Sequence, residues 1–405
     1  MKRIITAVII ISILLSGCGA VNTESGTQEL QNSAENKVET ATGGVWLSFT
    51  EIRSILTSPK GFQNEVTAVA DNCNKLGLQN VYIHVRSHCD SIFKSEFFPL
   101  AEALASYDYD VFEFMINTFH SKGIKVHAWI NPYRVSTASA DVSAVRSDSP
   151  IHKWLSDDLA DNDKNVCIYN GVYLNPAEEE VRRLVIDGVR EIAIKYQVDG
   201  IHFDDYFYPT TDDSFDADSY KVYKQNAAKP LELDEWRRAN VNALISGCYS
   251  AIKFISKDII FSISPAASIE KNYSELYADV ESWVENGNVD CIIPQLYFGF
   301  EYADSKYRFK KLLNDWKELM SSNGEVELLI GLASYKIGTD TEADGTEWQR
   351  DTDIIARQVK MCYDDDRIGG YVLFSYSSLM SEEELNTKQR ENLIEFKEGL
   401  NWTVL

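Results

Sequence analysis

The chain is organised around one stretch, DGIHFDDYFYP at residues 199–209. Read as a strand, it places apolar and polar side chains on opposite faces. The polar face carries His202 and Asp204, and acidic and aromatic residues follow beyond the strand end: Asp205, Tyr206 and Tyr208. Adjacent carboxyl groups among aromatic rings favour carbohydrate chemistry, because glycosidic cleavage needs carboxyl groups and sugar C–H faces pack on aromatic rings. A strand end followed by an acidic loop is the simpler alternative.

Strand-like and helical runs alternate along the rest of the chain. The other expected strands are residues 45–49, 81–86, 125–130, 259–264, 291–295, 328–332 and 370–374. The expected helices are residues 64–76, 111–122, 178–196, 235–255, 275–285, 309–320, 354–363 and 390–400. Eight strands, each followed by a helix, predict a closed (β/α)8 TIM barrel with its active-site groups at the C-terminal strand ends. A doubly wound open sheet is disfavoured because no Gly-rich phosphate loop follows the first strand.

Two long stretches without a strong period interrupt this alternation. Residues 135–176 follow the third strand and residues 209–234 follow the fourth. Because loops after barrel strands surround the active-site end, we expect these two insertions to form walls of a cleft.

The N-terminus has the pattern of a bacterial lipoprotein signal. Lys2 and Arg3 precede an apolar run over residues 4–15, and Leu-Ser-Gly-Cys ends at Cys18. We therefore expect a signal peptide over residues 1–17, lipidation of Cys18, export, and anchoring to the cell membrane. An uncleaved anchor or an ordinary secretory signal is the alternative. Residues 18–42 are polar and predict a disordered tether, which leaves residues 43–405 as the barrel.

The net charge and the cysteine pattern exclude some classes of partner and of site. The chain carries 62 acidic and 39 basic residues, a net charge of −23, which argues against nucleic acid as an electrostatic partner. Besides Cys18 there are six widely spaced cysteines without CxxC pairing. This pattern excludes a Cys-rich zinc site and a dense disulfide framework. We expect most of the six cysteines to be buried as small apolar residues, and one or two disulfides among them are the alternative.

Polar side chains also alternate along the neighbouring strands. The second strand carries Tyr82, His84 and Arg86, and the third carries His127, Trp129 and Asn131. Burying such groups without partners costs about 1–3 kcal/mol each, so they need partners or a ligand. The three strand histidines with Asp204 also raise the possibility of a metal site. The first strand reads WLSF at residues 46–49, without the His-x-His pair of metal-dependent hydrolases on this fold, so we expect no metal and no other cofactor. No Gly-x-Ser-x-Gly elbow or His-paired cysteine signature is present either.

A series of motifs resembles the bacterial glycosyl hydrolase-like 10 family. They are GVWLSF (44–49), VRSHCDSIFKSEFFPL (85–100), HAWINPYRV (127–135), YLNPAEEEVRRLV (173–185), DGIHFDDYFYP (199–209), WRRANVNALI (236–245), SISPAAS (262–268) and PQLYFGF (294–300). The resemblance covers nearly all of the chain after the tether. It implies a TIM-barrel glycoside hydrolase of the cell envelope, with peptidoglycan glycan strands as the substrate. One departure is RSHCD at residues 86–90, where the family tends to read Arg-Pro-x-Gly-Asp.

The candidate catalytic residues are Asp204, Asp205 and Asp90. One member of the adjacent pair is expected to be the general acid, because two close carboxyl groups split their pKa values. Asp90 or Glu51 would be the second carboxylate of a retaining or an inverting enzyme, and substrate assistance by an acetamido group is a third route. The residues expected to bind the polysaccharide are His84, Arg86, His127, Trp129, Asn131, Tyr133, Arg134, His202, Tyr206, Tyr208, Gln295 and Tyr297. A tethered glycan-binding protein without catalysis is the non-enzyme alternative.

Overall fold

A computed structural model describes residues 41–137, 139–157, 159 and 162–399 of the chain. The predicted signal peptide, Cys18 and the tether up to residue 40 lie outside the described residues, as does the last residue of the predicted helix over 390–400.

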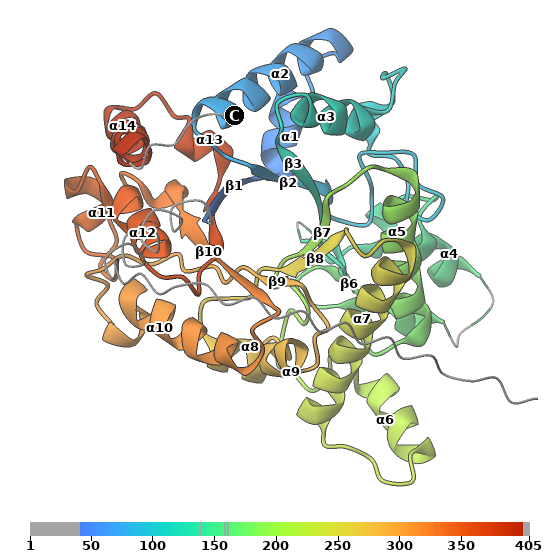
Figure 1. Ribbon diagram of the computed structural model, residues 1–405. Helices are drawn as coiled ribbons and strands as arrows, with labels where there is room; N and C mark the ends of the chain where they lie inside the picture. The colour runs from blue at the N-terminus through green and yellow to red at the C-terminus, as the bar shows by residue number, and fades with distance from the viewer. Residues whose placement is uncertain (1–40, 138, 158, 160–161, 400–405) are drawn as a thin grey trace, which may run out of the picture. The chain divides into compact units, whose positions relative to one another are not determined.

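Eight parallel strands form a closed barrel in the order β1-β11-β10-β9-β8-β7-β3-β2. Their bounds are β1 (Thr42–Leu47), β2 (Asn80–Arg86), β3 (Lys125–Ile130), β7 (Gly200–Phe203), β8 (Ile260–Ile263), β9 (Cys291–Ile292), β10 (Glu327–Ala333) and β11 (Gly370–Phe374). The barrel closes where Thr42 of the first strand pairs with Gly370 of the last. The predicted (β/α)8 fold is confirmed (Figure 1).

Helices surround the barrel (Figure 1). The longer ones are α2 (Pro59–Lys75), α3 (Val111–His120), α5 (Glu179–Lys195), α7 (Leu233–Ile255), α10 (Phe309–Leu319), α12 (Ile354–Tyr363) and α14 (Glu384–Gly399). The shorter ones are α1 (Phe49–Ile55), α4 (Pro150–Ser156), α6 (Ala217–Asn226), α8 (Ile269–Ser274), α9 (Val280–Glu285), α11 (Glu347–Arg350) and α13 (Tyr376–Leu379). Single 3-10 turns are η1 (Glu102–Leu104), η2 (Val142–Ala144), η3 (Asp163–Asn165), η4 (Ser305–Tyr307), η5 (Met320–Ser322) and η6 (Ser334–Lys336). The helix α5 buries an apolar stripe that includes Val181, Val185 and Val189.

Several expected elements have other bounds in the structure: α2 begins at Pro59 rather than at residue 64, α14 begins at Glu384 rather than at residue 390, and β9 ends at Ile292 rather than at residue 295. Two further differences have local reasons. The first strand ends at Leu47 rather than Phe49, because Ser48 and Glu51 form a capping box that starts α1. The expected helix over residues 275–285 is wrong in its first half: α9 begins at Val280, where the Asp279 carboxylate accepts a hydrogen bond from the Ser282 amide.

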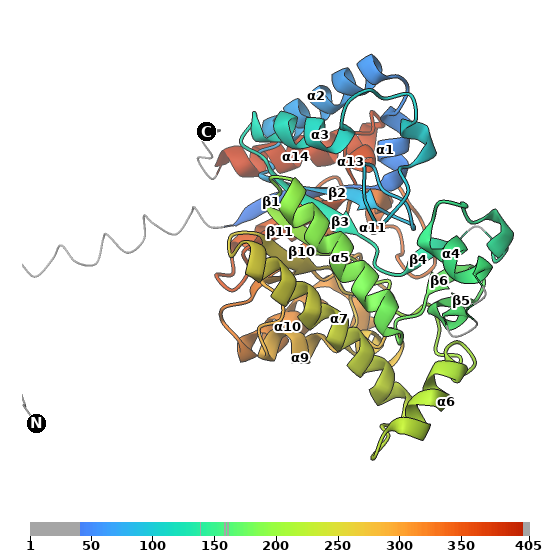
Figure 2. The same ribbon diagram turned by 90° about the vertical axis from the view of Figure 1, so that its right-hand side faces the viewer.

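The two predicted insertions are present, and both project from the same end of the barrel (Figure 2). The first contains α4 and a three-stranded antiparallel sheet of β4 (Arg134–Ser136), β5 (Val166–Ile168) and β6 (Val172–Leu174). The second contains α6 and is fixed to the barrel by an ion pair between Arg237 and Asp216, at 2.6 Å and 0% exposed on both sides. The Arg237 guanidinium group also donates a hydrogen bond to the Tyr277 hydroxyl, so it binds a second partner besides Asp216.

The inside of the barrel is partly polar. Its apolar layer is made by side chains such as Trp46, Tyr82 and Leu329. His202 lies among them and accepts a hydrogen bond from Trp46 Nε1 at 3.1 Å, while its Nδ1 lies 2.9 Å from Ser262 Oγ. Both ring nitrogens of His202 therefore have hydrogen-bond partners inside the barrel.

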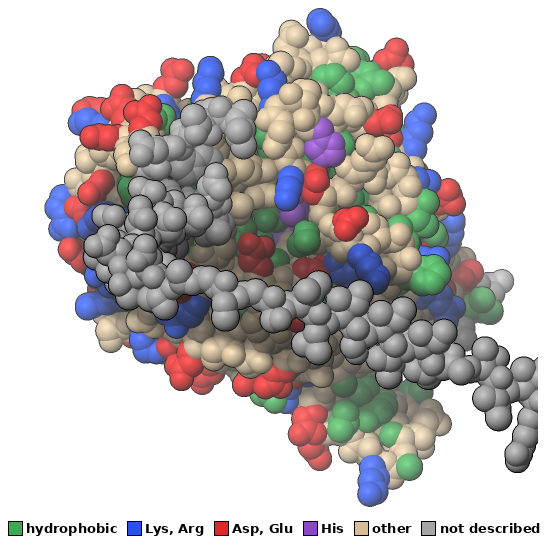
Figure 3. Space-filling model, viewed as in Figure 1, with side chains coloured by type: hydrophobic (Ala, Val, Ile, Leu, Met, Phe, Trp, Pro, Cys, Tyr) green, Lys and Arg blue, Asp and Glu red, His purple; other side chains and the backbone are tan. Residues whose placement is uncertain are grey.

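The six described cysteines are all buried and unpaired. Within the described ranges, no helix has the length and apolar character needed to cross a bilayer. On the face seen in Figure 3, acidic side chains are spread along the edge and interspersed with lysine and arginine.

Candidate active site

A cavity of about 460 Å³, here called the rim pocket, opens at the C-terminal ends of the strands. Every barrel strand, or the loop directly after it, contributes to its wall. The contributing side chains, in chain order, are Trp46, His84, Trp129, Asp204, Ser264, Gln295, Tyr335 and Phe374. The pocket therefore occupies the position where groups distant in sequence converge in a (β/α)8 barrel.

Asp204 is the acidic side chain in the pocket wall, and its carboxylate is tightly held. It accepts hydrogen bonds from Trp129 Nε1 at 3.1 Å and from Asn131 Nδ2 at 3.0 Å. The Asn131 amide is itself oriented, because its Oδ1 accepts from the Arg134 backbone N–H. Burial raises the pKa of Asp204, while the charge of Arg134 and the bonds from Asn131 and Trp129 oppose this rise. The pKa stays above its ordinary value, so these groups orient the Asp204 carboxyl group and only partly offset the effect of its burial.

Asp205 has a different environment from its neighbour. Burial, together with the charge of Asp204, raises the pKa of Asp205 to about 7, although a hydrogen bond from the Gln295 side chain opposes the rise. Asp205 is not part of the pocket wall, but it is hydrogen-bonded to Gln295, which lines the pocket. The two carboxyl groups therefore differ as acid and base partners must: one holds a proton near neutral pH and the other is charged.

Two pairs of stacked aromatic side chains line the rim pocket. His84 stacks on Trp129 with ring centroids 3.7 Å apart, Tyr297 stacks on Phe374 at 5.7 Å, and the Trp129 and Phe374 rings meet edge to face at 6.5 Å. At the mouth, Tyr206 is 55% exposed and Tyr335 is 41% exposed. Exposed aromatic faces beside polar groups suit the mixed surface of a sugar ring.

His84 faces the pocket with its hydrogen-bonding capacity unused. It is 2% exposed, and neither ring nitrogen has a hydrogen-bond partner. Burial, with a contribution from the charge of Arg134, lowers its pKa well below the ordinary value, so the ring is neutral. A neutral imidazole offers one donor and one acceptor, which is what a sugar hydroxyl pair requires.

The structure brings part of the predicted set to the pocket and leaves part outside it. The predicted residues in its wall are His84, Trp129, Arg134, Asp204, Tyr206, Gln295 and Tyr297. Asn131 lies behind the wall and holds Asp204. Tyr335, Phe374 and Phe49 also form the wall and were not selected from the sequence, although each follows or ends an expected strand. Tyr206 was selected as an aromatic residue just beyond a strand end, and this position at or after a strand end would have indicated all three.

Five predicted substrate-binding residues lie away from the pocket. His127 is beneath it, stacked on Tyr82 and 3.1 Å from Asn80 Oδ1, and His202 supports Trp46 from within the barrel. Tyr133 is buried near Arg182 and Cys248, and Tyr208 packs against Tyr277. Arg86 packs over Phe98, because a bulge between His84 and Arg86 reverses the alternation of β2. None of these five side chains is part of the pocket wall.

Glu51 and Asp90, the candidates for a further carboxylate, are also outside the rim pocket wall. The Glu51 carboxylate accepts hydrogen bonds from Ser48 N and Oγ and from Ser375 Oγ and Ser377 N. It therefore joins the loop after β1 to the loop after β11, and its acceptors are occupied. Asp90 lines a separate cavity on the same rim.

The strand histidines do not converge into a metal site. The Tyr82 ring contacts both His127 and His202, at centroid distances of 4.4 and 4.8 Å, and Trp129 lies between His84 and His202 at 3.7 and 6.4 Å. Over the residues that the structure describes, no group of three or more His, Cys, Asp or Glu side chains is placed to hold a metal ion.

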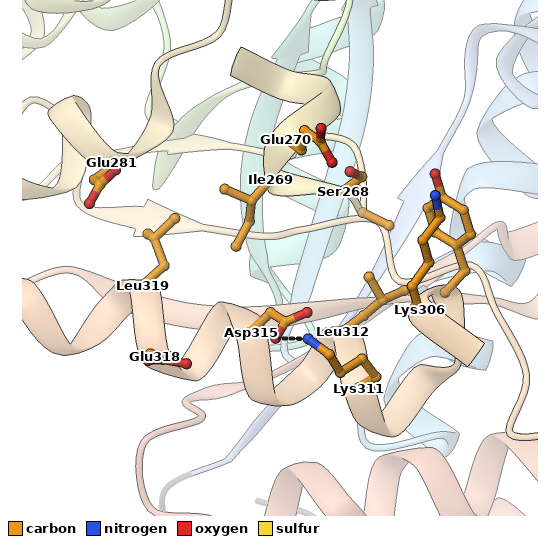
Figure 4. Close-up of a pocket in the computed structure, with 12 residues that line it drawn as sticks. Ser268, Ile269, Glu270, Glu281, Lys306, Lys311, Leu312, Asp315, Glu318 and Leu319 are labelled. Atoms are coloured by element: carbon orange, nitrogen blue, oxygen red, sulfur yellow. Dashed lines mark hydrogen bonds and ion pairs between the residues drawn. The ribbon is translucent and has the colours of Figure 1, made fainter. Parts of the chain in front are cut away.

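Another groove, of about 430 Å³, lies outside the barrel (Figure 4). It runs between Ser268–Glu270 at the start of α8 and the face of α10 that carries Lys311 and Asp315, which form an ion pair at 2.5 Å. None of the predicted site residues lines it. The candidate chemistry is therefore concentrated in the rim pocket.

The fold and site define a (β/α)8 barrel protein with an acidic, aromatic-walled pocket at the C-terminal rim. The model of the family "Glycosyl hydrolase-like 10" matches residues 42–350, and the chain belongs to this family. The family resemblance drawn from the sequence motifs is thereby confirmed.

Similar proteins are found by sequence and by structure. Glycosyl hydrolase YngK of Bacillus subtilis (strain 168) is 28% identical over 348 residues, which span 80% of this chain and 64% of that protein. Glycosyl hydrolase DigH of Escherichia coli (strain K12) is 28% identical over 352 residues, 80% of this chain and 77% of that protein. The solved glycoside hydrolase domain of PgaB (BpsB) from Bordetella bronchiseptica superposes with a TM-score of 0.58 at 13% identity, covering 87% of this chain and 98% of that one. Because only 13% of the residues are identical, the similarity to the PgaB domain concerns the fold alone.

Proposed function

We propose that this protein is a glycosidase of the cell envelope that cleaves O-glycosidic bonds in peptidoglycan glycan strands. The observation that carries the proposal is the Asp204–Asp205 pair, whose members lie in different environments at the end of the fourth barrel strand, beside an aromatic-walled pocket. The names of the relatives support an action on glycosidic bonds. The predicted lipoprotein signal at Cys18 and the family resemblance favour an envelope polymer as the substrate.

The pocket favours one of the three mechanistic routes. In the described part of the chain, Asp204 is the one carboxylate in the pocket wall, and Glu51 and Asp90 lie elsewhere. The ordinary retaining and inverting routes need a second carboxylate on the other side of the glycosidic bond from the general acid. An adjacent pair is sufficient when the acetamido oxygen of an N-acetylhexosamine attacks the anomeric carbon itself. Peptidoglycan strands consist of such sugars, so the route and the proposed substrate agree.

The two carboxyl groups then have separate roles. The leaving oxygen lies at the edge of the rim pocket next to Gln295, the wall residue that is hydrogen-bonded to Asp205. Asp205 gives this oxygen its proton as the glycosidic bond breaks, since a pKa of about 7 keeps much of Asp205 protonated near neutral pH. Asp204 remains charged, orients the acetamido group and stabilises the positive charge that develops on the sugar. Trp129 and Asn131 fix the position from which it does so.

The first test measures reducing-end release by residues 43–405 from peptidoglycan glycan strands, with and without stem peptides. Asp204→Asn and Asp205→Asn are expected to abolish release while retaining the wild-type circular dichroism spectrum. Asp213→Asn, at an exposed site in the second insertion, is the matched control and should retain activity. Near-normal release by both site variants would contradict the assignment. Glycan binding without release by the wild type would instead favour a tethered glycan-binding protein.

A second test separates the two roles. An aryl N-acetylhexosaminide with a phenol leaving group of low pKa needs no proton from the enzyme. Asp205→Asn should therefore recover activity on this substrate, whereas Asp204→Asn should not. Recovery in Asp204→Asn alone would reverse the two roles.

A further inference from the structure

A second polar cavity lies on the same rim of the barrel. This side cavity has a volume of about 310 Å³ and is walled by α1, by the loop after β2 and by the start of the first insertion. Its wall includes Arg53, His88, Asp90, Ser136 and Arg146. None of these residues contributes to the wall of the rim pocket.

The two cavities share a thin partition. Phe49 is in the wall of the rim pocket, and its ring lies edge-on to His88 of the side cavity at 5.3 Å and to His84 of the rim pocket at 5.7 Å. The Arg53 guanidinium lies 5.3 Å from the centre of the same ring. The backbone links them too, because Arg134 lines one cavity and Val135 the other. The two cavities therefore lie next to each other on the rim, separated by the Phe49 ring.

The side cavity carries both hydrogen-bond donors and acceptors. Asp90 and Asp141 supply carboxylates, while Arg53 and Arg146 supply guanidinium groups. Arg146 is engaged by Asp148 at 2.7 Å, whereas Arg53 is exposed and forms no ion pair with a described carboxylate. A site for an anion would not present two carboxylates, and a site for an apolar group would not present these charges. Balanced donors and acceptors around a small concave surface fit a neutral polyhydroxylated ligand.

We propose that the side cavity is a second sugar-binding subsite, which holds a unit of the glycan strand next to the sugar bound in the rim pocket. The proposal rests on the proposed function and deepens it, because it makes the enzyme selective for polymeric strands over short fragments. Asp90 is then a substrate-binding residue that accepts hydrogen bonds from sugar hydroxyls, and Arg53 donates to them. The candidate catalytic role of Asp90 is replaced by a role in chain-length selectivity.

The test compares Arg53→Ala and Asp90→Asn with the wild type on linear N-acetylglucosamine di-, tetra- and hexasaccharides and on glycan strands. Loss of one hydrogen bond to a charged group should lower kcat/KM on the long substrates about tenfold. Cleavage of an aryl N-acetylhexosaminide should be unaffected, because its single sugar occupies the rim pocket and does not reach the side cavity. Arg183→Ala is the control, since Arg183 is exposed on α5 and forms an ion pair with the likewise exposed Glu179. An equal loss on all lengths, or no loss on any, would overturn the subsite.

Binding measurements distinguish this proposal from the function on which it rests. Calorimetric titration of the same oligosaccharides into Asp204→Asn removes turnover from the comparison. Affinity that increases from di- to hexasaccharide, and a gain that Arg53→Ala abolishes, would support the subsite even if the wild type released no reducing ends. A gain with length that Arg53→Ala and Asp90→Asn both leave unchanged would reject the subsite while leaving the glycosidase assignment intact.

Discussion

Replacing Asp205 should make the protein more stable above neutral pH while it removes activity. Burial and the charge of Asp204 raise the pKa of Asp205 from its ordinary value of 3.8 to about 7. Between these two pH values the unfolded chain releases this proton and the folded chain keeps it. The contribution of Asp205 to stability is therefore fully present below about pH 4 and is lost as the pH rises through about 7.

The magnitude follows from the width of that interval. It covers about three pH units, and each unit is worth about 1.36 kcal/mol, so the wild type loses at most about 4 kcal/mol through this group. Asn mimics the protonated acid and does not titrate. Asp205→Asn should thus match the wild type near pH 4 and exceed its unfolding free energy by about 2–4 kcal/mol near pH 8, where partial solvation of the side chain reduces the upper value.

The assay is urea unfolding of residues 43–405 at several pH values between about 4 and 8.5, followed by tryptophan fluorescence. Asp213→Asn reports the effect of removing an acidic side chain that is exposed to solvent. A stability difference that is absent at pH 8, or that is the same at every pH, would refute the assignment of the raised pKa to Asp205. The alkaline limb of the activity profile should lie near the same pH, because both depend on one proton.

Three further substitutions test other parts of the site and fold. Trp129→Phe removes the hydrogen bond to Asp204 but keeps a ring against His84, so kcat should fall about tenfold at unchanged melting temperature, as steady-state kinetics will show. Tyr335→Ala should raise KM several-fold with little change in kcat, because the Tyr335 ring, 5.7 Å from Tyr297 at the mouth, contacts the substrate equally in the ground state and in the transition state. A fall in kcat as large as the rise in KM would contradict this role. Asp216→Asn leaves Arg237 buried without its counter-charge and should cost about 3–5 kcal/mol in urea unfolding.

The barrel was predictable because its strands and helices carry strong local patterns. The third and eighth barrel strands and the helix over residues 354–363 have the predicted bounds, since apolar runs there end at clear turn or polar residues. The small sheet of the first insertion was not predicted. Its strands are three residues long, which is too short to show a period, and they pair only through tertiary contacts.

The site was predicted in its centre and less well at its edges. Asp204, Trp129 and His84 were correctly expected on one rim, because strict alternation keeps them on the inner face of their strands. Alternation failed at Arg86, where the bulge after His84 turns the side chain outward. Beyond a strand end there is no alternation to follow, so sequence alone did not distinguish Tyr206 at the mouth from Tyr208 in the core.

The polar residues outside the pocket explain how such a site is maintained. A charged Asp204 at the end of β7 is stable only if its donors are fixed, and those donors, Trp129 and Asn131, belong to β3 and the turn after it. The ring of Trp129 is fixed in turn by its stack on His84, while His202 holds Trp46 below. The barrel interior therefore exchanges part of its apolar packing for a hydrogen-bonded support that keeps one carboxylate charged beside one that holds its proton. Loss of that support should change the pH profile of the activity before it changes the fold.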